Sequence, residues 1–259
     1  MARKIKNIAL GSIPFLVVII IWFFGNYFSF FPRWMIPSPF TTAQTFFWLI
    51  KDGTLLQLAW GSIQIALVGF GFATIVAVIL GILIGSYPTM RKIFFPFFSA
   101  VYIVPSLAWL PVIILILGFT KTTVICIVFL SSFKKIIYNV VSGVRSVNIS
   151  WILAGKNIGL NKFEITYKII IPAALPQIIT GLRMGFASAW RTLIGAEMLV
   201  SGAAGLGRFI WNAQWFLAFD KVFSGIIIIA LIGMLAEQFV FKPFEDKTLI
   251  KWGLAQEEI

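Results

Sequence analysis

The sequence predicts an all-α integral membrane protein with about six transmembrane helices. Two features of its composition support this: 60% of the 259 residues are hydrophobic, and only 12% are charged. A soluble domain averages roughly 45–50% apolar and about 25% charged residues. The third observation is that the apolar residues form long runs. Too little polar surface remains for a soluble particle, and we expect one membrane domain over residues 1–259 with its core at 60–241.

Six runs are long enough to cross a bilayer, which requires about 20 mostly apolar residues. They are Ile8–Phe24, Trp60–Tyr87, Phe94–Phe119, Thr122–Val141, Ala173–Val200 and Val222–Phe241. The segment Ile36–Gly53 contains two prolines and Asp52, and it does not resemble a span. The basic start followed by the first run could also be a signal peptide, but no small-residue cleavage site follows it. We therefore expect an uncleaved first helix.

The distribution of basic residues predicts the orientation. With the N-terminus inside, 14 of the 21 Lys and Arg residues fall in inside segments, among them Lys134 and Lys135, and five fall outside. The remaining two, Arg183 and Arg191, lie in the fifth run. The positive-inside rule therefore places both termini in the cytoplasm. The net charge of +12 reflects this topology and does not indicate a nucleic-acid partner.

The longest inside segment, residues 147–172, lies between spans four and five and predicts two short helices. Asn148 or Ser150 can cap the first helix, in which Trp151, Ala154 and Ile158 share one face. Gly159 stands where a helix end needs a left-handed residue.

The second helix is predicted to start at Asn161, because Glu164 follows at the spacing of a capping box. Pro172 is expected to end the segment. Such a helical elbow can dock into a groove of a partner protein, or it can lie on the membrane surface. The residues alone leave both alternatives open.

The run Leu153-Ala154-Gly155-Lys156-Asn157-Ile158-Gly159, followed after nine intervening residues by Ile169-Ile170-Ile171-Pro172, resembles the motif loop of ABC-importer permeases. The resemblance implies that this loop is a coupling helix that sits in a cleft of an ATPase subunit. Its motif positions here are Leu153, Ala154, Gly155, Gly159, Ile169 and Pro172. The sequence departs from the motif at Leu153, where the family has Glu, at Gly155, where it has Ala, and at Ile171, where it has Leu.

Further stretches are similar to permeases of the nitrate, sulfonate and taurine type. They cover about residues 34–240 and include Ile36–Pro39, Pro105–Pro111, Gly143–Val147, Leu175–Arg183, Ala189–Leu199 and Gly205–Gly207. Lys134-Lys135 departs from the family, which has a proline-containing segment there.

Three charged residues fall within the fifth span: Arg183, Arg191 and Glu197. A charge at mid-bilayer costs about 2.5–3.5 kcal/mol on insertion scales, so such residues face a protein interior or a water-filled path. Glu197 is six residues from Arg191, which is about 120° and about 9 Å away on a helix. We therefore predict an ionic partner for Glu197 on another helix or a second copy. The three residues are candidates for the pore or gate, or alternatively for structural ion pairs.

Pro105 and Pro111 are expected to kink the third span and to free backbone carbonyls, which must then be satisfied by protein or by a cavity. We include both prolines among the pore candidates. The pairs Gly81/Gly85 and Gly181/Gly185 are expected to allow close helix packing.

Several kinds of chemistry have no residues to carry them. The sequence has no His, a single Cys and no phosphate-binding loop, so we expect no metal, no cofactor and no catalysis, with ATP bound by a partner subunit. The leading hypothesis is the permease of an ATP-driven importer for a small solute. It implies two ATPase subunits, an extracytoplasmic binding protein and a homodimer in the bilayer of the inner membrane. The alternatives are a scaffold that recruits an ATPase without forming the path, and a membrane-embedded enzyme.

Overall fold

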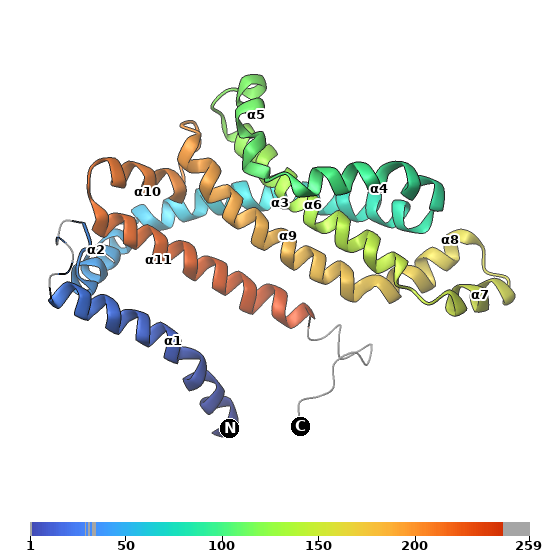
Figure 1. Cartoon of the computed structure of the whole chain (residues 1–259), viewed down its shortest axis with the longest axis horizontal. Helices are drawn as coiled ribbons and strands as arrows, with labels where there is room; N and C mark the ends of the chain where they lie inside the picture. The colour runs from blue at the N-terminus through green and yellow to red at the C-terminus, as the bar shows by residue number, and fades with distance from the viewer. Residues whose placement is uncertain (1, 29, 31, 33–34, 246–259) are drawn as a thin grey trace.

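The structure is a computed structural model that describes residues 2–28, 30, 32 and 35–245. All its regular elements in these residues are helical (Figure 1). Several basic residues used for the orientation lie outside this description: the side chains of Arg3, Lys4 and Lys6, and residues Arg33, Lys247 and Lys251.

The helices follow one another with short connections. They are α1 (Ala2–Tyr27), α2 (Pro39–Lys51), α3 (Thr54–Ser86), α4 (Pro88–Ile103), a 3₁₀ turn (Ser106–Trp109), α5 (Leu110–Leu117), α6 (Lys121–Arg145), α7 (Ile149–Asn157), α8 (Lys162–Ile165), a π-turn (Thr166–Ile170), α9 (Ile171–Leu199), α10 (Leu206–Trp215), α11 (Phe219–Ala236) and a second π-turn (Glu237–Phe241).

Helices α3, α6 and α9 run along the length of the molecule and form its centre (Figure 1). Glycines allow them to approach closely. An added Cβ at Gly81 would lie 2.7 Å from the Val140 side chain of α6, and one at Gly185 would lie 2.6 Å from Ile136 of the same helix. The predicted packing role of these glycines is therefore confirmed.

Four helical segments are long and apolar enough to cross a membrane: Thr54–Ser86, Lys121–Arg145, Lys162–Leu199 and Phe219–Glu245. They correspond to the second, fourth, fifth and sixth predicted runs. Helix α1 covers the first run, and its described apolar part spans Leu16–Tyr27. Helix α2 has 13 residues, which is too short for a span, as expected.

The third predicted span, Phe94–Phe119, is not one straight helix. The chain bends by 94° between α4 and the Ser106–Leu117 segment, so the pair forms a broken span or a re-entrant loop. The bend occurs at Pro105, because the residue before a proline avoids the helical conformation and Val104 is extended (φ −70°, ψ 125°). Pro111 causes no second kink, since it lies in the first turn of α5, where a missing N–H is harmless.

Helices α7 and α8 form one end of the molecule, and α2 and α10 form the other (Figure 1). Helix α10 was not predicted from the sequence. Many large apolar side chains are exposed, including Phe72 (63%), Ile75 (60%) and Leu115 (86%). A surface of this kind suits contact with lipid.

Candidate functional site

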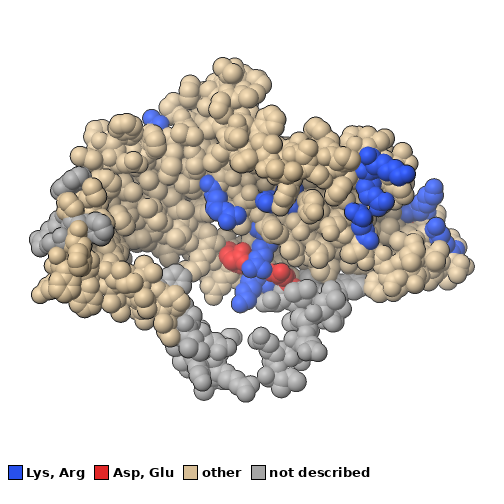
Figure 2. Space-filling view, in the orientation of Figure 1, with Lys and Arg blue, Asp and Glu red and all other residues tan. Residues whose placement is uncertain are grey.

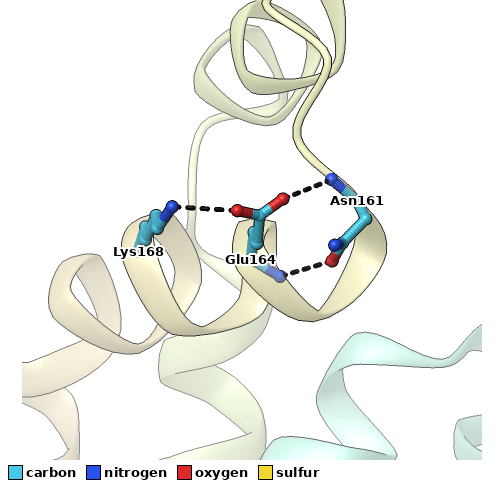
Figure 3. Close-up of polar contacts among 3 residues, drawn as sticks. All are labelled: Asn161, Glu164 and Lys168. Atoms are coloured by element: carbon cyan, nitrogen blue, oxygen red, sulfur yellow. Dashed lines mark hydrogen bonds and ion pairs between the residues drawn. The ribbon is translucent and has the colours of Figure 1, made fainter.

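The elbow formed by α7 and α8 is held by local capping bonds. The Asn148 side chain accepts a hydrogen bond from the backbone N–H of Ser150 (2.9 Å). Asn161 and Glu164 form the predicted capping box: each side chain accepts from the other residue's backbone N–H, at 2.9 and 3.0 Å (Figure 3). Lys168 adds an ion pair with Glu164 at 2.9 Å. These bonds fix the start of both helices.

Gly159 provides the turn between the two helices. Its φ is +86°, in the left-handed region that the sequence predicted for this position. The next residue, Leu160, donates its N–H to the Gly155 carbonyl (3.0 Å), which closes the end of α7. No atom lies within 4 Å of a Cβ added at Gly159, so the backbone conformation, not space, requires glycine here.

The motif positions Gly155 and Ile169 come together. Gly155 is buried, and an added Cβ would lie 2.5 Å from the Ile169 Cδ1 atom and 3.5 Å from Ile165 Cγ1. Helix α7 therefore packs directly on the start of the long helix that follows. This contact explains why two motif residues separated by 14 positions belong to one site.

The outer surface of the elbow is apolar and exposed. Leu153 is 50% exposed, Ile158 76%, Phe163 78% and Tyr167 66%, and Ala154 is exposed among them. A shallow groove beside this surface is lined by Trp151, Ala154, Gly155, Ile158, Lys168, Ile169, Pro172 and Ala173. In Figure 2, Lys and Arg side chains gather at this end of the molecule. This surface can bind a partner protein or lie on the membrane surface.

Pro172 does not end the segment, contrary to the prediction. The helix runs without interruption from Lys162 to Leu199. A π-turn at Thr166–Ile170 precedes the proline, and the Ile171 N–H donates to the Thr166 carbonyl five residues back. The wider turn accommodates a proline, which has no N–H and would clash with the carbonyl four residues before it.

Glu197 is fully buried and is not paired with a cation. Its carboxylate accepts hydrogen bonds from Ser62 Oγ of α3 (2.8 and 3.0 Å) and from the backbone N–H of Gly207 (2.8 Å). Ser62 Oγ in turn accepts from the Leu206 N–H (2.9 Å). The predicted ionic partner is therefore wrong within the described residues, because the first turn of α10 supplies N–H donors that satisfy the carboxylate. Sequence reasoning missed this because it did not predict α10.

Arg183 forms ion pairs with Glu237 and Glu245 beyond the end of α11. Red and blue side chains meet there in the lower middle of Figure 2. The contacts tie α9 to the C-terminal helix. They support the structural alternative for Arg183 and do not place it at a pore.

Arg191 is exposed, and no carboxylate of the described chain lies within salt-bridge distance of it.

Lys134 and Lys135 lie within α6 and not in an inside loop as predicted, since α6 continues for ten residues, about 15 Å, beyond Lys135. Lys134 is 6% exposed and donates to the Val104 carbonyl at the bend before Pro105. The Val104 carbonyl, which the bend leaves without a helical partner, is thus satisfied by protein.

Comparison with known proteins identifies a family. Residues 77–241 match the model of the binding-protein-dependent transport system inner membrane component. The chain is 35% identical over 202 residues to the putative ABC transporter permease protein MJ0413 of Methanocaldococcus jannaschii, covering 78% of this chain and 75% of that protein.

Two further relatives have more specific names. Identity is 35% to the taurine transport system permease protein TauC of Escherichia coli, covering 72% of this chain and 67% of the relative. It is 33% to the putative aliphatic sulfonates transport permease protein SsuC of Bacillus subtilis, covering 84% and 78%.

The fold is similar to a chain in a structure of inward-facing conformations of the MetNI methionine ABC transporter, with a TM-score of 0.60 at 18% identity. That similarity covers 75% of this chain and 95% of the other. Permease components of this family are not enzymes, so the interpretation as a membrane-embedded enzyme is excluded. The family match covers more than half of the chain, and the protein is a multi-pass membrane protein that belongs to the binding-protein-dependent inner membrane components, the permeases of ABC importers.

Proposed function

We propose that this chain forms the transmembrane path of an ABC importer for a small solute and couples that path to ATP hydrolysis through the α7–α8 elbow. The path and the coupling are both part of the proposal. The relatives named for taurine and aliphatic sulfonates make a small oxyanion-bearing solute the first class to test.

The observation that carries the coupling role is the exposed apolar surface on a braced elbow. Leu153, Ile158 and Phe163 are each at least half exposed, although the capping box and the Gly155–Ile169 contact hold the backbone in one shape. Exposed apolar side chains on a pre-organised surface favour binding of a partner protein, because little conformational entropy is lost on docking. An ATPase subunit of the ABC type is the partner that the family implies.

The remaining partners follow from the same family. We infer two ATPase subunits, an extracytoplasmic binding protein that delivers the solute, and a homodimer of this chain across the path. We also infer that both termini face the cytoplasm. The gathering of Lys and Arg at the elbow end (Figure 2) agrees with the positive-inside rule for that orientation.

The test uses two elbow variants in the assembled transporter. Gly159→Val places a β-branched residue at φ +86°, and Ala154→Trp fills the groove that Ala154 lines. Both should leave the permease inserted in the membrane. Both should lose the ATPase subunit on pull-down from detergent, or keep it and lose the ATP hydrolysis that the loaded binding protein stimulates.

Matched controls separate coupling from folding. Gly159→Asn keeps a residue that tolerates the left-handed conformation and should retain coupling. Thr122→Trp adds the same aromatic at an exposed position at the start of α6, away from the elbow. Normal ATPase retention together with normal transport in both elbow variants would reject the coupling role. Stronger membrane attachment of Ala154→Trp without loss of coupling would favour an interfacial helix.

A further inference from the structure

Well inside the membrane-spanning helices, about two turns or more from either end, three cations have no carboxylate partner in the described chain: Lys134, Lys135 and Arg191. Lys135 lies 14 residues from the start of α6 and ten from its end, about 21 and 15 Å, which is close to the middle of the helix. Charges at that depth are costly unless protein, water or an ion accompanies them. Each cation therefore needs an explanation.

Lys134 is accounted for by the fold. It is buried, and its ammonium group donates to the Val104 carbonyl that the bend at Pro105 leaves without a helical partner. We assign it a structural role.

Lys135 points to the same bend but is less enclosed. Its Nζ donates to the Tyr102 hydroxyl (2.8 Å) and lies 4.2 Å from the centre of the Tyr102 ring. An ammonium group has three donor hydrogens, and the hydroxyl accepts one. Lys135 is thus held in place by a neutral group, with its charge uncompensated.

Arg191 lies on α9 beside a group of hydroxyls. Ser131 of α6, four residues before Lys135, shares hydrogen bonds with Ser188 (2.7 Å) and Thr192 (2.8 Å) of α9. Arg191 therefore occupies the level of Ser131, about one helical turn or 6 Å of rise from Lys135. Arg191 is exposed, and it lies between Met184 and Gly195 along α9. Gly195 is close to the bend, because a Cβ added there would lie 3.0 Å from Leu107.

The acidic residues of the described chain are all engaged elsewhere. Glu197 binds Ser62 and Gly207, and the others pair as follows: Asp52 with Thr54, Glu164 with Lys168, Asp220 with Thr45, and Glu237 and Glu245 with Arg183. Within the described residues no carboxylate is therefore left for Lys135 and Arg191, and a mobile anion can balance their charge.

We propose that Lys135, Arg191 and Ser188 form an anion station in the membrane path, which binds a small oxyanion such as a sulfonate or nitrate during its passage. This inference rests on the proposed role of the chain in forming the path. The guanidinium offers a planar fork of donors that matches two oxygens of an oxyanion, while the ammonium and hydroxyl supply single donors.

The test measures the local electrostatic potential directly and does not require the natural solute. A cysteine replaces Met184 in a Cys126→Ala background, in the full-length permease assembled with its ATPase subunits. Met184 is 43% exposed, and its sulfur contacts Asn139, whose amide also donates to the Lys135 carbonyl. The rates of modification by an anionic and a cationic methanethiosulfonate reagent are compared, and their ratio is divided by the ratio for a small thiol in solution.

We expect the anionic reagent to be favoured. A unit charge about 10 Å away in an effective dielectric of about 40 changes the local concentration of a monovalent ion about fourfold, in opposite directions for the two reagents. Lys135→Gln and Arg191→Gln should therefore each lower the ratio by about 10- to 20-fold. Lys135→Arg should preserve it, and Lys121→Gln, which removes a charge at the start of the same helix, should leave it unchanged.

A second arm tests binding. Methanesulfonate should slow modification of the cysteine by a neutral reagent, whereas tetramethylammonium at equal ionic strength should not. Equal effects of the two salts, a ratio equal to that in solution, a ratio unaffected by either Gln variant, or a cysteine that reacts with neither reagent would each overturn the anion station. Because these rates do not depend on ATP hydrolysis, such a result would leave the coupling role of the elbow intact, and loss of that role would leave these rates unchanged.

Discussion

Replacement of Glu197 distinguishes a structural anchor from a gate. The buried carboxylate joins three helices, since Ser62 comes from α3, Glu197 from α9 and Gly207 from the first turn of α10. Two glycines beside the carboxylate leave no room for a side chain. A Cβ added at Gly205 would lie 2.1 Å from Glu197 Oε1, and one added at Gly207 would lie 2.3 Å from the Ile194 carbonyl oxygen. The surroundings are built around the carboxylate, which favours an anchoring role.

The magnitude follows from the hydrogen bonds. Glu197→Gln replaces one acceptor oxygen by an NH₂ group, which then faces a donor at Ser62 or Gly207. Loss of one hydrogen bond to a charged group, with a donor left unsatisfied, costs about 1–3 kcal/mol. For a chain of this size that corresponds to a fall of about 2–12 °C in Tm. Glu197→Ala should cost more, because it leaves both donors unpaired.

The assay is the thermal stability of the purified permease, followed by the loss of its monodisperse chromatographic peak on heating. Ser62→Ala provides the matched partner for a double-mutant cycle, and we expect the two residues to be coupled by about 0.5–3 kcal/mol. Transport should fall only as far as the amount of folded transporter falls. Normal stability of Glu197→Gln combined with abolished transport would refute the anchor and restore the gate that the sequence suggested.

The other predictions concern the elbow, the C-terminal tie and the topology. Gly155→Val should reduce ATPase retention on pull-down, because the added Cβ would lie 2.5 Å from Ile169. Adding Ile169→Ala to that variant should restore part of the retention, and a lack of rescue would contradict the packing of these two residues. Arg183→Gln should change stability by less than about 1 kcal/mol in a melting assay, since its ion pairs are partly exposed, and a strong loss of uptake at normal stability would argue for a path role instead. Single cysteines at Lys156 and Lys51 should react with an impermeant thiol reagent from opposite sides of the membrane, and labelling of both from outside would overturn the orientation.

Features encoded by neighbouring residues could be predicted from the sequence. The capping box at Asn161–Glu164 and the left-handed turn at Gly159 depend on a few consecutive residues, and both are confirmed. Four of the predicted spans likewise coincide with helices that are long and apolar enough to cross a membrane, because length and hydropathy define such helices. The close approach at Gly81 and Gly185 was also readable, since small residues at helical spacing have few other uses in a membrane.

Features that depend on contacts between distant segments could not be predicted. The partner of Glu197 is a backbone N–H of a helix that the sequence did not reveal, and the partner of Lys134 is a carbonyl 30 residues away. That carbonyl belongs to Val104, at the broken end of α4 next to Pro105. Glu197 was recognised as a costly charge within a span, whereas Lys134 was assigned to an inside segment, and in both cases the partner is set by the tertiary fold.

The unbroken helix from Lys162 to Leu199 constrains how the chain length can vary. Adding or removing one residue in an α-helix rotates everything beyond it by about 100°, so an insertion within α9 would turn the outer surface of the elbow away from its present direction relative to Arg191. The π-turn at Thr166–Ile170 is the exception, because it already holds one residue more per turn than an α-helix. A single deletion there can be absorbed by conversion to an ordinary α-turn. The register between the elbow and the membrane segment is therefore adjustable at one place, immediately before Pro172.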